Sequence, residues 1–125
     1  MTKQILVVDD AATVRLYHGT ILRDAGFGVA EAANGYEALE ASLAQDFDLM
    51  VVDVNMPRMD GYSFVSAVRR EGQNSTTPIV MVSTESETHD ADRAYASGAN
   101  VYLRKPVQAE DLVSFAIGLT GGDGP

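Results

Sequence analysis

The chain contains no cysteine and no tryptophan, and it has half as many basic as acidic residues. Without cysteine it has no disulfide, no thiolate ligand for zinc and no thiol nucleophile. Eighteen acids against nine Lys and Arg give a formal net charge of −9. This charge disfavours nucleic acid and anionic membranes as partners, because both bind through a basic surface.

Long apolar runs are also absent. No stretch approaches the roughly 18 residues of a membrane helix, so we expect no membrane insertion. The apolar residues 5–8, directly after the polar start, are too short for a secretion signal, which favours a cytoplasmic protein. We expect one domain over residues 1–120 and a disordered tail over residues 121–125, with no room for an output domain.

Three short apolar segments, residues 5–8, 49–52 and 79–82, are rich in branched side chains. Continuous runs of this kind are typical of strands that are buried on both faces of a parallel sheet. Two half-polar segments, residues 28–32 and 100–104, are typical of edge strands.

Helical spacing of apolar residues fills each gap between these strands. The residues expected to face the core are Val14, Tyr17, Ile21 and Ala25; Leu39 and Leu43; Val65 and Val68; Ala91, Ala94, Tyr95 and Gly98; and Leu112, Phe115, Ala116 and Leu119. Five alternations of strand and helix predict an α/β fold, a doubly wound five-stranded parallel sheet. The flavodoxin-like strand order 2-1-3-4-5 fits three central and two edge strands.

Polar residues follow four of the predicted strands. Asp9 and Asp10 follow the first, Asp53 the third, Ser83 the fourth and Lys105 the fifth. Because the carboxyl ends of parallel strands meet at one edge, these side chains should share a cleft. Two carboxylates about 5 Å apart repel by roughly 3 kcal/mol at an effective dielectric constant of about 20. A divalent cation would relieve this repulsion, and an all-oxygen ligand set favours Mg²⁺, with Mn²⁺ possible as a substitute.

These residues together resemble the receiver domain of bacterial response regulators. The resemblance extends from about residue 3 to residue 119. The matching motifs are Val-Asp-Asp-Ala-Ala-Thr-Val-Arg at 8–15, Val-Asp-Val-Asn-Met-Pro at 52–57, Asp-Gly at 60–61, Val-Ser at 82–83 and Lys-Pro at 105–106. It implies a stand-alone, CheY-like regulator.

The resemblance implies a phosphorylation site at Asp53, which would accept a phosphoryl group from a histidine kinase. Asp10 would bind Mg²⁺ directly, Asp9 mainly through water, and Asn55 through its backbone carbonyl. Asp53 would complete the metal site.

It also implies a switch. Lys105 would pair with the phosphoryl oxygens, Ser83 would move to donate a hydrogen bond to them, and Tyr102 would then turn inward. Asn55, Thr84 and Glu85 stand at positions that tune the lifetime of the acyl phosphate.

We therefore expect a phosphorelay signalling switch that acts in chemotaxis and catalyses only its own phosphotransfer and slow autodephosphorylation. Its partners would be a chemotaxis-type histidine kinase and a flagellar motor switch protein or a histidine phosphotransfer protein. One alternative is a phosphate shuttle or sink. Another is a Mg²⁺-dependent aspartyl phosphatase, which is disfavoured because Asn55 replaces the second Asp that such an enzyme uses as its general acid.

Overall fold

Strands and helices alternate along the whole chain in a computed structural model that describes residues 2–70, 72–84 and 88–121. The predicted tail at 121–125 lies outside this range except for Gly121. The elements are β1 (Gln4–Val8), α1 (Ala12–Asp24), β2 (Gly28–Ala32), α2 (Gly35–Ala44), β3 (Leu49–Asp53), α3 (Gly61–Arg70), β4 (Ile79–Ser83), α4 (Thr88–Ser97), β5 (Val101–Arg104) and α5 (Ala109–Leu119).

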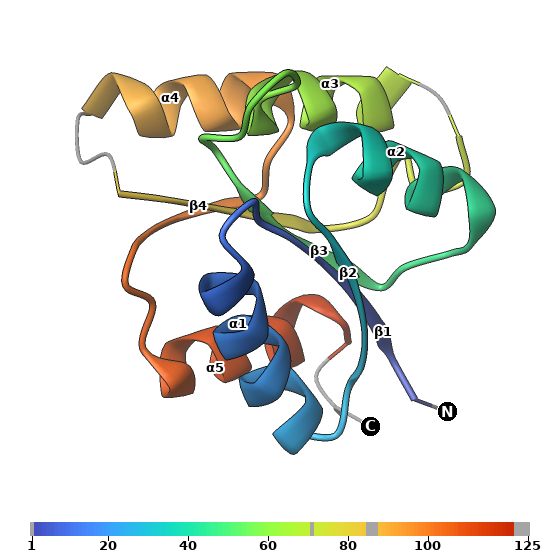
Figure 1. Cartoon of the computed structure of the whole chain (residues 1–125), viewed down its shortest axis with the longest axis vertical. Coiled ribbons are helices and arrows are strands. Elements are labelled where there is room, and N and C mark those ends of the chain that lie inside the picture. The colour runs from blue at the N-terminus through green and yellow to red at the C-terminus, as the bar shows by residue number, and fades with distance from the viewer. Residues whose placement is uncertain (1, 71, 85–87, 122–125) are drawn as a thin grey trace.

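The five strands form one parallel sheet in the order β2-β1-β3-β4-β5, which confirms the predicted fold (Figure 1). Val8 pairs with Val52 of β3, and Asp53 pairs with Val82 of β4. Ser83 pairs in turn with Arg104, the residue before Lys105. This register brings the carboxyl ends of the four strands to one edge of the sheet.

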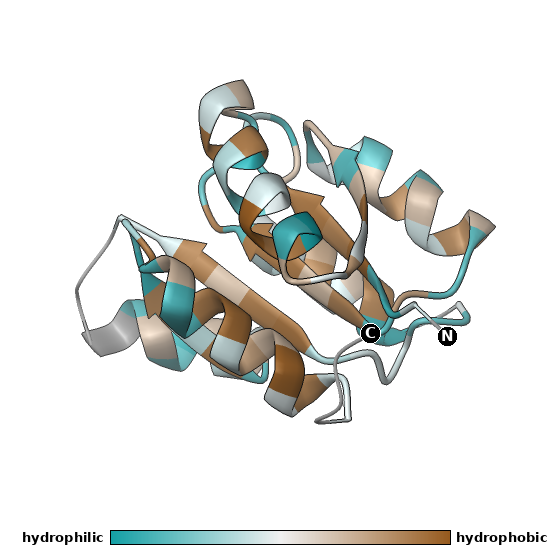
Figure 2. Cartoon of the chain, turned by 90° about the horizontal axis from the view of Figure 1, so that it is seen from below, coloured by the Kyte–Doolittle hydropathy of each residue, from teal (hydrophilic) through white to brown (hydrophobic). Residues whose placement is uncertain are grey.

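Side chains of the central strands alternate between two cores, one on each face of the sheet. Leu6 and Val8 of β1 face the core under α2, α3 and α4, whereas Ile5 and Val7 face the core under α1 and α5. Figure 2 shows the hydrophobic strands lying between these two helical layers.

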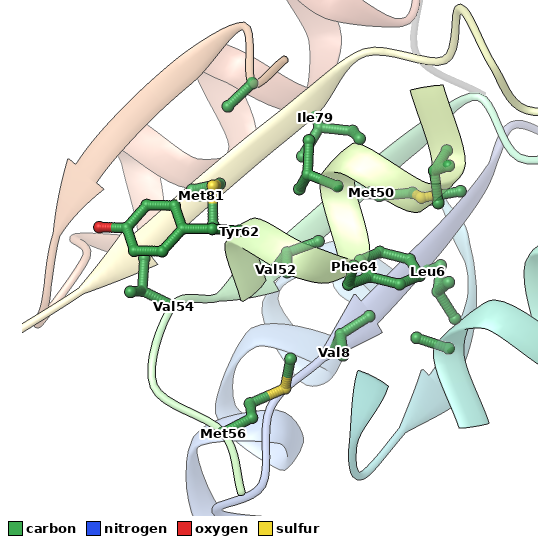
Figure 3. Packing of buried hydrophobic residues seen from close by; sticks show 14 of the residues in the cluster. Leu6, Val8, Met50, Val52, Val54, Met56, Tyr62, Phe64, Ile79 and Met81 are labelled. Atoms are coloured by element: carbon green, nitrogen blue, oxygen red, sulfur yellow. The ribbon is translucent and has the colours of Figure 1, made fainter. Parts of the chain in front are cut away.

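The core under α3 is closely packed around one aromatic residue. Phe64 is fully buried among side chains of β1 and β3, and Tyr62 of the same helix lies near Met81 and Val54 (Figure 3). Removing a buried Phe side chain typically costs 3–5 kcal/mol, so this core fixes the position of α3 on the sheet.

Two helices begin at a side-chain N-cap. Asn34 accepts a hydrogen bond from the Glu37 N–H at 2.9 Å, and Asp60 accepts one from the Ser63 N–H at 2.8 Å. Ala11 precedes α1 without a side-chain cap, as expected from its methyl group.

Some predicted core positions are wrong. Tyr17, Leu43 and Tyr95 are exposed, at 45%, 57% and 50% of their surface, although each fits an apolar stripe in the sequence. His18, next to the exposed Tyr17, is buried. On α1 the buried face is formed by His18, Gly19 and Leu22, so the helix is rotated relative to the predicted stripe.

Candidate phosphoryl and metal site

Three carboxylates meet at the carboxyl edge of the sheet. Asp9 follows β1 and Asp53 ends β3, and both are buried, whereas the neighbouring Asp10 is exposed. One carboxylate oxygen from each residue lies within 4.8 Å of the other two. The sheet register therefore builds the predicted cluster from residues that lie 44 positions apart along the chain.

Lys105 joins the two buried carboxylates. Its Nζ donates to Asp9 Oδ2 at 2.8 Å and to Asp53 Oδ1 at 3.0 Å. The backbone at this residue is held in place, because the Lys105 N–H donates to the Ser83 carbonyl at 2.7 Å. The following peptide bond to Pro106 is cis. One ammonium group thus partly compensates two buried negative charges.

Part of the negative charge of the two carboxylates stays uncompensated, and the pKa of Asp53 is raised to about 6. Burial is the main cause, and the negative charge of Asp9 adds to it; the hydrogen bond from Lys105 opposes both. Burial by itself lowers the pKa of Lys105, but its hydrogen bonds to Asp9 and Asp53 outweigh that effect and the net shift is upward. The lysine therefore stays protonated, whereas Asp53 is poorly stabilised as an anion.

The donor set fits a hard divalent cation. Carboxylate oxygens from three residues converge, and none of the described residues adds a histidine or sulfur ligand to the cluster. Asp9 already accepts from Lys105 and, through Oδ1, from the Ala11 N–H at 2.9 Å. Asp10, exposed and beside the cluster, is the residue whose carboxylate is open to a metal ion and its water ligands.

The loop after β3 is held close to Asp53. The Asn55 N–H points to Asp53 Oδ1 at 3.4 Å, and the Gly61 N–H donates to the Val54 carbonyl at 2.9 Å. A Cβ on Gly61 would overlap the Asp53 carbonyl oxygen and would lie 2.9 Å from the Val54 Cα. Only glycine lets the start of α3 approach the end of β3 this closely.

The predicted switch residues lie at two different depths. Ser83 is fully buried at the end of β4, one strand away from Asp53. Tyr102 is partly buried on β5 and packs against the core under α4. Thr84 is exposed beside Lys105, and Glu85 lies outside the described residues.

His18 is the residue near this site that sequence reasoning missed. Its imidazole is 2% exposed, and Nδ1 has no hydrogen-bond partner among the described residues. Burial lowers the pKa of His18; the charge of Asp9 raises it and that of Lys105 lowers it. A polar residue one position after the apolar Tyr17 gave no sequence signal for burial.

A slot of about 310 Å³ opens beside Lys105. It is lined by α1 residues Val14, Tyr17 and His18, by Thr84, and by the segment 105–107. The Tyr17 hydroxyl donates to the Val107 carbonyl at 3.1 Å and ties α1 to this segment. The surface next to the carboxylates is therefore largely apolar.

Residues 5–116 match the response regulator receiver domain. Chemotaxis protein CheY of Pseudomonas aeruginosa is 38% identical over 110 residues, which cover 87% of this chain and 89% of that protein. Protein PilG of the same organism is 30% identical over 110 residues, covering 88% and 82%. The solved structure of Vibrio cholerae chemotaxis protein CheY4 has a TM-score of 0.90 at 38% identity, covering 95% of this chain and 99% of that one. The chain belongs to the response regulator receiver domain family.

Proposed function

We propose that this chain is a phosphorylation-dependent signalling switch that accepts a phosphoryl group on Asp53 from a histidine kinase, with Mg²⁺ as cofactor. The observation that carries this proposal is the convergence of three carboxylates and one lysine. Ligand atoms of Asp9, Asp10 and Asp53 lie within 4.8 Å of one another, and Lys105 reaches both Asp9 and Asp53.

Asp53 would act as the nucleophile. One of its carboxylate oxygens would attack the phosphorus of a phosphohistidine, the P–N bond would break, and the released imidazole would take up a proton. The Lys105 ammonium group would then donate its hydrogen bond to the phosphoryl oxygens in place of the Asp53 carboxylate. Mg²⁺, held by Asp10 and Asp53 with Asp9 and the Asn55 carbonyl, would neutralise the negative charge on the transferring group.

The new charge would drive the switch. An acyl phosphate adds about −1.5 to −2 charge and three acceptor oxygens. A new charge-assisted hydrogen bond from Ser83 contributes about 1.5–3 kcal/mol, which is part of the roughly 5.5 kcal/mol that inverts a 1:99 population. A partner that binds only the active form would supply the rest. Movement of Ser83 would then let Tyr102 turn inward.

The apolar slot beside Lys105 supports a protein phosphodonor. A donor histidine must approach Asp53 from solvent, and the exposed Leu16 and Tyr17 of α1 continue the apolar surface next to that opening. An apolar, exposed patch of this kind is suited to contact with a partner helix.

Chemotaxis is the proposed setting because relatives named as chemotaxis proteins align over nearly the whole chain. The upstream partner would be a chemotaxis-type kinase, and the downstream partner a flagellar motor switch protein in the cytoplasm. A phosphate shuttle that passes the group to a histidine phosphotransfer protein, or a phosphate sink, uses the same site. A multiple-turnover phosphatase is not proposed, because Asn55 provides no proton for a leaving group.

Acetyl phosphate with Mg²⁺ tests the proposal. Intact-mass spectrometry should show one added phosphoryl group on the wild-type chain and on Asp46→Asn, an exposed control on the α2–β3 loop. Asp53→Asn, or removal of Mg²⁺ with EDTA, should abolish the addition. Undiminished phosphorylation of Asp53→Asn would overturn the assignment of the phosphoacceptor.

A further inference from the structure

A second, chemically different groove lies between α3 and α4, which run side by side on one face of the sheet (Figure 1). Its volume is about 420 Å³, within the range of small-molecule sites. Its polar lining comes from Tyr62, Ser63, Ser66 and Arg70 of α3 and from Arg93 and Ser97 of α4. We call it the α3–α4 groove.

The α3–α4 groove carries positive charge, whereas the protein as a whole is negatively charged. Arg70 and Arg93 are the charged residues in its described lining, which holds no carboxylate, although the whole chain has twice as many acids as bases. Within the described part of the chain, neither guanidinium forms a salt bridge, whereas Arg15, Arg23 and Lys105 each do. Two guanidinium groups that form no salt bridge with a described residue therefore line one small concavity.

One of these arginines is held in place. The Arg93 guanidinium lies 4.3 Å from the centre of the Tyr62 ring, a cation–π contact. Tyr62 itself is buried, and its hydroxyl donates to the Asp90 carbonyl at 3.3 Å. Tyr62 belongs to α3 and Arg93 to α4, so the contact orders the Arg93 side chain across the groove. A ligand that binds Arg93 would therefore cost little side-chain entropy.

We propose that the α3–α4 groove binds a small diphosphate-bearing molecule. A guanidinium group binds phosphate through two parallel hydrogen bonds, and the α3–α4 groove presents one such group on each wall, so each could bind one phosphate. Hydroxyl groups of Ser63 and Ser66 add donors for the remaining phosphate oxygens. A hollow of about 420 Å³ is commensurate with a small molecule of this kind.

Such a ligand would bridge α3 and α4. It would tie Arg93, and with it α4, to the helix that begins directly after the Asp53 loop. Amide hydrogen exchange in α4 should therefore slow when the groove is filled. This binding does not depend on phosphorylation, so it can be tested separately from the switch.

The test is a titration of the ¹⁵N-labelled full chain with inorganic pyrophosphate at low ionic strength and without Mg²⁺. We expect saturable shifts of the Ser63, Ser66 and Ser97 amides and slower exchange in α4. Arg70→Ala and Arg93→Ala should each weaken binding by about tenfold or more, the effect of losing a charged hydrogen-bonded group.

Two control variants make the result specific. Arg104→Ala removes an exposed arginine on β5, and Asp46→Asn neutralises an exposed carboxylate on the α2–β3 loop; both should leave the affinity unchanged if the α3–α4 groove is the site. Shifts that do not saturate, shifts confined to residues around Lys105, or an affinity of Arg70→Ala and Arg93→Ala equal to that of the wild type would overturn the proposal.

Discussion

Lys105 Nζ lies 3.0 Å from Asp53 Oδ1, although 52 residues separate the two along the chain. The same nitrogen lies 2.8 Å from Asp9 Oδ2, so the segment after β5 and the ends of β1 and β3 meet at one ammonium group. The lysine that would later bind phosphoryl oxygens thus first holds together two carboxylates that would otherwise repel each other.

Replacing this lysine should destabilise the metal-free protein. In Lys105→Ala the buried Asp9 and Asp53 lose their counter-charge, and breaking a buried pair typically costs about 3–5 kcal/mol. Urea unfolding in EDTA at pH 8 measures the loss. Arg104→Ala, which removes the exposed neighbour, should change the free energy of unfolding by less than about 0.5 kcal/mol. Equal effects of the two substitutions would contradict a structural ion pair at Lys105.

The raised pKa of Asp53 makes stability depend on pH in a defined direction. The pKa of Asp53 is about 6 in the folded protein, whereas the ordinary value for this group is 3.8. Between pH 4 and 6 the folded chain therefore binds more protons than the unfolded one. The free energy of unfolding therefore falls as pH rises through this window, by about 3 kcal/mol from this residue.

Asp53→Asn isolates this contribution. In EDTA the variant should gain stability over the wild type as pH rises from 4 to 7, and the gain should level off above pH 7. The comparison also cancels the opposite trend from His18, whose lowered pKa removes stability as pH falls. A constant difference between the two proteins from pH 4 to 8 would show that the pKa of Asp53 is not raised.

Mg²⁺ should stabilise the protein through the carboxylate cluster. At a concentration one hundred times the dissociation constant the gain is about 2.7 kcal/mol, which for a domain of this size raises Tm by roughly 10 °C. Asp10→Ala should lose this response and should melt slightly higher than the wild type in EDTA, because one negative charge is gone. Differential scanning calorimetry of the wild type and of Asp10→Ala, with and without Mg²⁺, measures these changes in Tm. Clear destabilisation of both Asp10→Ala and Asp53→Ala in EDTA would contradict a crowded cluster.

Gly61 and Gly118 offer a matched pair of glycine substitutions. Gly61→Ala places a methyl group against the Asp53 carbonyl and should cost about 1–3 kcal/mol while slowing phosphorylation. Gly118→Ala on α5 meets nothing within 4 Å and should be neutral or stabilising by up to about 1 kcal/mol. Thermal unfolding and the acetyl phosphate reaction rate test both. Normal stability and rate in Gly61→Ala would show that α3 does not need this close approach.

The sequence was sufficient to predict the parallel sheet and the carboxylate cluster. Apolar runs that end in Asp9, Asp53 or Ser83 determine both where a strand ends and which polar group stands at the edge. A parallel order then brings these groups together without further information.

The sequence was not sufficient to predict which face of each helix is buried. On α1 a buried His18 and an exposed Tyr17 reverse the order that hydrophobicity predicts. Tyr17 reaches Val107 with its hydroxyl, so a long-range hydrogen bond, invisible to local periodicity, helps to set the rotation of this helix. The α3–α4 groove was missed for a similar reason, since Arg70 and Arg93 belong to different helices.

A crystal structure of the chain with Mg²⁺ and beryllium fluoride is the most direct test of the phosphoryl site. The account predicts beryllium bound to an Asp53 oxygen, Mg²⁺ ligated by Asp10 and Asp53, and fluorine atoms that accept hydrogen bonds from Ser83 and Lys105. Beryllium fluoride bound elsewhere, or Mg²⁺ without contact to Asp10 and Asp53, would contradict it.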